Sequence, residues 1–127
     1  IVCIIKRAYL SIYKLLDRRL TMDMPEILSA YFAADKGKDA SILTSVCAND
    51  AVVHDEGQKH VGAKAIRDWW LAAKAKYNHV AEPIDAHQTG NEIIVRAKVS
   101  GQFPNSPIEL RYFFVIKEGK VAEMGVK

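Results

Sequence analysis

The sequence predicts one α+β domain, in which a curved antiparallel sheet wraps around N-terminal helices and forms a cone. In the first half of the chain, apolar residues recur at the spacing of helices, and in the second half they alternate with polar residues as in strands. Helices that precede an antiparallel meander are typical of α+β domains. A curved sheet wrapped on a long helix has an open end, where we expect a pocket.

Two helices are expected at the start of this domain. Pro25 suits the first turn of a helix, and Gly37 suits the position just after a helix end. Asp39 can cap a short second helix because its side chain can accept a hydrogen bond from the first free backbone N–H groups.

A short strand and a third helix follow. The strand is expected over residues 51–54, and Gly62 begins the helix. The apolar stripe of this helix contains Ile66, Trp69, Trp70, Ala73 and Tyr77. We expect its basic residues, Lys74 among them, to face water.

Four antiparallel strands complete the domain. Residues 92–101 and 108–117 alternate most clearly, and glycine-containing turns flank them. Residues 79–88 carry Pro83, which cannot donate a ladder hydrogen bond, so this strand is expected at a sheet edge or with a bulge. The last strand is expected over residues 121–126.

Composition excludes several functional classes. The 127 residues carry a net charge of only +3, spread along the chain, which argues against a nucleic-acid partner. Cys3 and Cys47 lie far apart, as expected for a reduced, cytoplasmic protein without a disulfide. The histidines and acids show no metal-ligand spacing, so we expect no metal site.

Residues 1–21 differ from the rest and form a basic amphipathic segment. It can be a membrane-surface anchor, a helix that docks on a partner, or sequence upstream of a natural start at Met22 or Met24. We favour the third interpretation, with the folded domain over residues 22–127. Membrane contact is expected only if the segment is native.

The stretch "DAVVHD" followed by "VGAKAIRDWW", together with the final "YFFVIKEGKVAEM" hairpin, carries a family resemblance. Over residues 25–126 the chain resembles the nuclear transport factor 2-like superfamily, in particular SnoaL-like proteins and ketosteroid isomerases. The resemblance implies a cystatin-like roll with an apolar pocket, usually in a homodimer. It does not imply one activity, because this fold hosts isomerases, cyclases, dehydratases and binding modules.

The resemblance also implies roles for single residues. Asp55 stands where the isomerases have their general-base aspartate, Tyr31 where they have an oxyanion-hole tyrosine, and Trp70 where they have a pocket aromatic. The sequence departs from the isomerases at Tyr112, where they keep a protonated aspartic acid, and at Glu56, where they usually have proline.

These residues predict proton-transfer chemistry without a cofactor. A carboxylate in an apolar cone is a stronger base because its charged form is disfavoured there. Asp55 can remove a proton next to a carbonyl of a hydrophobic compound, and Tyr31 and Tyr112 can hold the enolate oxygen. The candidate substrate contacts are Trp69, Trp70, Phe114 and His54.

A non-catalytic domain that binds a small molecule or dimerises remains the alternative. In that case Asp55 caps a turn or pairs with Lys59, and the tyrosines only pack their rings in the core. His54 faces away from Asp55 unless the strand bulges, because adjacent strand residues point to opposite faces.

The outer face of the predicted sheet implies a partner. It carries Ile94, Phe113 and Val115 between charged residues. An apolar surface of this size favours a homodimer through the outer sheet face.

Overall fold

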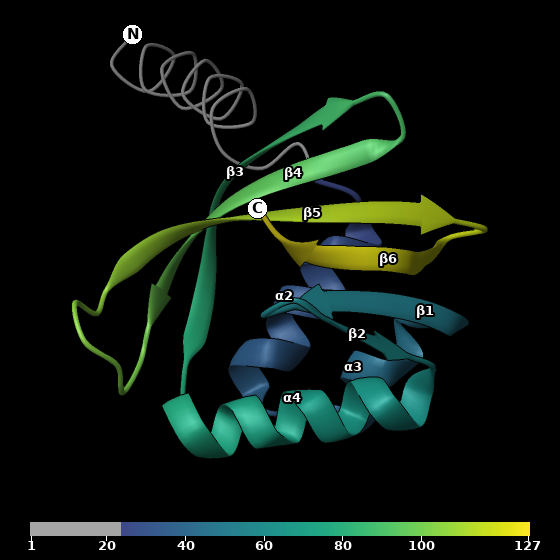
Figure 1. Cartoon of the computed structure of the whole chain (residues 1–127). Helices are drawn as coiled ribbons and strands as arrows, with labels where there is room; N and C mark the ends of the chain where they lie inside the picture. The colour runs from purple at the N-terminus through teal and green to yellow at the C-terminus, as the bar shows by residue number, and fades with distance from the viewer. Residues whose placement is uncertain (1–23) are drawn as a thin grey trace, which may run out of the picture.

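A computed structural model describes residues 24–127, and the predicted N-terminal extension lies outside them. The described part is an α+β domain, as the sequence predicts, in which helices pack against one side of a curved, unclosed sheet (Figure 1). Its elements are α2 (Glu26–Gly37), α3 (Ala40–Ser45), β1 (Cys47–Asp55), β2 (Gln58–Val61), α4 (Ala63–Tyr77), β3 (Val80–Thr89), β4 (Glu92–Ser100), β5 (Ile108–Lys117) and β6 (Lys120–Val126).

The sheet has the strand order β2-β1-β6-β5-β4-β3. Neighbouring strands are antiparallel except β1 and β6, which run parallel, so the sheet is mixed. As expected from Pro83, β3 is an edge strand, and its register shifts between Pro83 and Asp85. The middle of this unclosed sheet is formed by β6 and β5.

Strand β2 was not predicted from the sequence. It forms a hairpin with β1 through the two residues Glu56 and Gly57, whose φ angles of 50° and 76° are both left-handed. Such two-residue turns match the twist of the strands that they join. None of the four residues of β2 is fully buried, so no alternation marked it as a strand. The hairpin holds Asp55 at the end of β1, where its side chain enters the domain.

The ends of the two long helices meet. The left-handed residue after α2 is Lys38 (φ 56°) and not Gly37, which is the last helical residue, so the expected glycine cap is wrong by one position. The Lys38 ammonium donates a hydrogen bond of 2.6 Å to the side-chain oxygen of Asn78, itself the left-handed cap of α4. Asp39 caps α3 as predicted, accepting from the backbone N–H of Ile42 at 3.0 Å.

A close backbone approach fixes the passage from α4 to β3. Gly101 follows β4, and a Cβ atom built on it would lie 2.7 Å from the Tyr77 carbonyl oxygen and 2.9 Å from the His79 Cα atom. The neighbouring Gln102 N–H donates to the same Tyr77 oxygen at 2.6 Å. No side chain larger than hydrogen fits at Gly101 unless this backbone moves.

We expect Gly101→Ala to lower the free energy of unfolding by about 1–3 kcal/mol, as overpacking against a well-packed neighbour does. Gly37→Ala is the matched control, because nothing lies within 4 Å of the place that its new methyl group would take, and its backbone is helical. It should stabilise by up to about 1 kcal/mol. Urea unfolding of both variants measures the difference, and equal stabilities would contradict the close approach.

Candidate functional site

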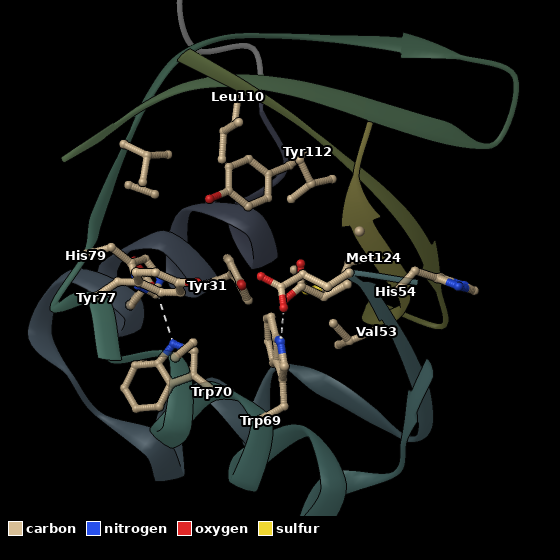
Figure 2. Close-up of a pocket in the computed structure, with 18 of the residues that line it drawn as sticks. Tyr31, Val53, His54, Trp69, Trp70, Tyr77, His79, Leu110, Tyr112 and Met124 are labelled. Atoms are coloured by element: carbon tan, nitrogen blue, oxygen red, sulfur yellow. Dashed lines mark hydrogen bonds and ion pairs between the residues drawn. The ribbon is translucent and has the colours of Figure 1, made fainter. Parts of the chain in front are cut away.

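A cavity of about 270 Å³ opens between α2, α4 and the concave face of the sheet (Figure 2). Apolar side chains form most of its wall, among them Val53, Ala81, Val99, Phe103, Leu110 and Met124. Polar groups enter it from three directions: Tyr31 and Asp35 from α2, Asp55 from β1, and Tyr112 from β5. Such a wall, apolar with a few convergent polar groups, is typical of a small-molecule site.

Asp55 is partly buried and lines the cavity. Its Oδ2 atom accepts a hydrogen bond of 2.8 Å from the indole Nε1 of Trp69, marked by the dashed line at Trp69 in Figure 2. Within residues 24–127 no lysine or arginine forms an ion pair with Asp55, so the alternative pairing with Lys59 does not occur in this structure. Among the described residues the carboxylate thus has a neutral hydrogen-bond donor and no cationic partner.

Tyr31 and Tyr112 line the same cavity as Asp55. Both rings are buried and pack edge-on against phenylalanines, with ring centroids 5.4 Å apart for Tyr31 and Phe114 and 5.7 Å apart for Tyr112 and Phe32. Burial, with a smaller contribution from nearby negative charge, raises the pKa of Tyr31 and that of Tyr112 well above the usual range. Both hydroxyls therefore stay protonated and can donate hydrogen bonds.

Of the predicted substrate contacts, Phe114 does not line the cavity, and His54 lines it but directs its imidazole elsewhere. Phe114 is fully buried behind the two tyrosines, where helix α2 covers it. His54 points away from the cavity (Figure 2), and its Nε2 lies 2.7 Å from the Glu123 carboxylate. The register shift in β1 lies between Cys47 and Val52, before His54, so the regular alternation of the strand directs His54 to the outer face.

Three functional candidates were not predicted from the sequence: Asp35, Lys74 and His79. Lys74 was expected to face water, but only 7% of its side chain is exposed. Helical spacing could have indicated that two of them are buried. Asp35 lies four residues after Tyr31, and Lys74 lies four residues after Trp70. Residues four apart share a helix face, and both of these faces are buried.

Asp35 and Lys74 form a buried ion pair beside the cavity. The Asp35 Oδ1 atom accepts hydrogen bonds of 3.0 Å from the Trp70 indole and 3.1 Å from the Lys74 ammonium. Lys74 also donates to the carbonyl of His79 and lies 5.5 Å from the centre of the Trp70 ring. Burial lowers the pKa of Lys74, and the Asp35 charge opposes this shift.

His79 lines the cavity next to this ion pair, with its Nε2 4.0 Å from Asp35 Oδ1. Burial, followed by the charge of Lys74, lowers the pKa of His79 below its usual 6.5, while Asp35 opposes the shift. The imidazole is therefore neutral at pH 7, with one nitrogen that donates and one that accepts.

Other chemistry has less support in this part of the chain. Between residues 24 and 127 no group of three or more histidine, cysteine or acidic side chains could hold a metal ion. Cys47 is buried, and burial raises the pKa of its thiol to about 11, so it is not a nucleophile at neutral pH. None of the described helices is long and apolar enough to cross a membrane.

Comparison with known proteins agrees with this architecture. The sequence model of the SnoaL-like domain matches residues 28–124. The chain belongs to the SnoaL-like family. No curated protein matches it significantly.

Solved structures resemble this SnoaL-like protein over most of its length. A putative polyketide cyclase from Sinorhizobium meliloti is 47% identical, with a TM-score of 0.80 over 84% of this chain and 97% of that one. A protein of ketosteroid isomerase-like fold from Catenulispora acidiphila, in complex with trimethylamine, is 20% identical, with a TM-score of 0.70 over 82% and 85% of the chains. TerC, co-crystallised with polyporic acid, is 15% identical, with a TM-score of 0.71 over 80% and 88%. The last two show the fold alone.

The depressed pKa of His79 predicts a dependence of stability on pH. Below pH 6.5 the unfolded chain takes up a proton on this residue more readily than the folded one, so the free energy of unfolding falls as the pH is lowered from 7.5 to 5.5. His79→Gln should flatten this slope. His87→Gln, at an exposed histidine of β3, should leave it unchanged. Urea unfolding over this range tests both, and equal slopes for the two variants would refute the assignment.

Proposed function

We propose that this SnoaL-like protein is a cofactor-free enzyme that uses Asp55 to remove a proton next to a carbonyl group of a hydrophobic compound. The observation that carries the proposal is the environment of Asp55: a carboxylate held by a neutral indole, in an apolar cavity that two protonated tyrosines also line. A cyclase, an isomerase or a dehydratase can each begin with this step.

Asp55 has the partner that a general base needs. The Trp69 indole fixes the orientation of the carboxylate through Oδ2 but brings no positive charge. A cation would stabilise the charged form strongly and so weaken the base, whereas a neutral donor does so less. The Oδ1 atom accepts no hydrogen bond from residues 24–127 and can take the substrate proton.

Tyr31 and Tyr112 stabilise the enolate that this proton removal produces. When the proton leaves, negative charge moves to the carbonyl oxygen of the substrate, which becomes an enolate. Hydroxyl donors that are already fixed in an apolar cavity stabilise this charge without reorganising. The edge-on packing of both rings against phenylalanines holds these hydroxyls in place.

The S. meliloti relative supports a cyclase as the specific activity, because it is 47% identical and is named a putative polyketide cyclase. In an aldol-type cyclisation the enolate carbon attacks a second carbonyl of the same molecule, and the alkoxide that forms takes up a proton. Asp55, protonated in the first step, can return that proton. In this proposal the same carboxylate carries out both transfers.

Asp55→Asn tests the general base. We expect the deuterium exchange of the C2 protons of 1-tetralone in D2O, followed by proton NMR, to lose about 10²–10⁴-fold of its enzymatic rate. The melting temperature should hold or rise, because an amide replaces a partly buried, uncompensated charge. Asp68→Asn is the matched control, since within the described part of the chain Asp68 forms only a surface pair with Lys64 on α4.

Two results of this experiment would contradict the proposal, each in a different way. If the wild-type protein exchanges 1-tetralone no faster than Asp55→Asn does, Asp55 is not a base for enolisable ketones and the non-catalytic ligand-binding domain becomes the better assignment. If Asp55→Asn does not fold, the hydrogen bond to Trp69 is structural and the site assignment is wrong.

A homodimer through the outer sheet face belongs to the same proposal. Ile94 and Phe113 are neighbours on β4 and β5 and are partly exposed, whereas Val115 is 8% exposed and already buried in the single chain. The apolar part of this face is therefore smaller than the sequence indicated. The proposed dimer is supported by the pair Ile94 and Phe113, which lies between charged side chains.

Light scattering tests the dimer. We expect a solution mass of about twice the 14.2 kDa of the chain, and Ile94→Lys should shift it to the monomer because it places a charge in the interface. Leu71→Lys, at an exposed leucine of α4, is the control that should keep the dimer. A monomeric wild type would remove the outer face from the proposal.

A further inference from the structure

The cavity contains a second carboxylate that is not fully satisfied by the protein. Asp35 is 3% exposed, and its Oδ1 atom accepts from both Trp70 and Lys74. Its Oδ2 atom, and the Nδ1 atom of His79, are buried without a hydrogen-bond partner within the described residues. Buried polar atoms are nearly always paired, so two such atoms on adjacent cavity residues need an explanation.

We infer that Asp35 and His79 form a subsite that binds a hydroxyl group of the ligand. The inference rests on the proposed function in one respect, that this cavity is where the ligand binds. A carboxylate oxygen can only accept, so the group that satisfies Asp35 must donate. A hydroxyl group can both donate and accept, so it has the chemistry to satisfy Asp35 Oδ2 as an acceptor and His79 Nδ1 as a donor when the imidazole proton is on Nδ1. A ketone or an ether oxygen cannot donate and leaves Asp35 unpaired.

The surrounding residues hold Asp35 in a fixed orientation for binding. Lys74 neutralises its charge, and Trp70 and Lys74 together hold the carboxylate through Oδ1. This leaves the direction of Oδ2 fixed. A carboxylate that is paired with a buried ammonium group remains a good acceptor for a hydroxyl.

The two carboxylates are held by consecutive residues of one helix. Trp69 donates to Asp55 and Trp70 to Asp35, and Figure 2 shows the two dashed hydrogen bonds at different places along the cavity. Tyr31 and Tyr112 lie close enough to both acids for each acid to raise their pKa values. A ligand can therefore place its carbonyl near the tyrosines and Asp55 while a separate hydroxyl reaches Asp35.

This arrangement narrows the substrate class to apolar, enolisable ketones that carry a hydroxyl group away from the reacting carbonyl. Sites that hydrogen-bond a hydroxyl discriminate strongly against analogues that lack it, because the buried protein groups are then left unpaired.

The test uses two probes that cannot be enolised at a carbonyl, 2-naphthol and 2-methoxynaphthalene. They have the same ring system, and only 2-naphthol can donate a hydrogen bond. We expect calorimetric titration of the full chain to give a Kd at least about tenfold lower for 2-naphthol. Since neither probe needs Asp55 to react, this result does not depend on the proton-transfer chemistry of the proposed function.

Variants of the protein then test which residues bind the hydroxyl group of 2-naphthol. Asp35→Asn combined with Lys74→Met removes both members of the ion pair together and so leaves no uncompensated buried charge. In this double variant the two probes should bind equally. In Asp55→Asn the preference for 2-naphthol should persist. A preference that survives the double variant, or that disappears only in Asp55→Asn, overturns the inference.

A second readout decides the matter if the double variant does not fold. Nitrogen-15 NMR of the wild-type imidazoles should show a shift of the His79 Nδ1 resonance on addition of 2-naphthol and none with 2-methoxynaphthalene, with the resonance assigned by its loss in His79→Gln. Equal Kd values for the two probes in the wild type, or an unchanged His79 resonance, would mean that water satisfies Asp35 and would overturn the inference.

Discussion

The two adjacent indoles of helix α4 are the contacts on which the site depends. Successive residues of a helix differ by about 100° in direction, so Trp69 and Trp70 reach different parts of the fold. Trp69 holds Asp55 at the end of β1, and Trp70 holds Asp35 near the end of α2. One helix thereby sets the distance between the β1 hairpin and α2, which are the walls that enclose the cavity with the sheet.

These two hydrogen bonds are chemically alike, yet the carboxylates that accept them differ because of their other neighbours. Asp35 also accepts from the Lys74 ammonium, which is 7% exposed, and so it belongs to a neutral pair. Asp55 has no ionic partner among the described residues. In the proposed reaction this difference assigns proton transfer to Asp55 and ligand binding to Asp35. The residue type alone would not separate the two roles.

Local patterns predicted the fold, and the family resemblance indicated part of the candidate site. Period-two alternation indicated the four-stranded meander, and the resemblance placed Tyr31, Asp55 and Tyr112, which line one cavity. Lys74 was missed because a lysine on a helix usually faces water, although its spacing from Trp70 put it on the buried face. No sequence pattern indicated the position of His79. It lies just before β3, where the backbone approaches Gly101 closely, and this places its ring near Asp35. Contacts of this kind depend on tertiary packing and not on a local pattern.

The cavity also explains why the proposed reaction needs no cofactor. Burial shifts Tyr31, Tyr112 and His79 toward their neutral forms, and Lys74 is compensated by Asp35. Proton abstraction then moves one negative charge from Asp55 to the substrate oxygen, and the total charge of the cavity stays constant. Neutral donors stand at both ends of this transfer, the Trp69 indole at one and the tyrosine hydroxyls at the other. Because no new charge is created in the apolar interior, hydrogen bonds that are already in place are sufficient to stabilise the enolate.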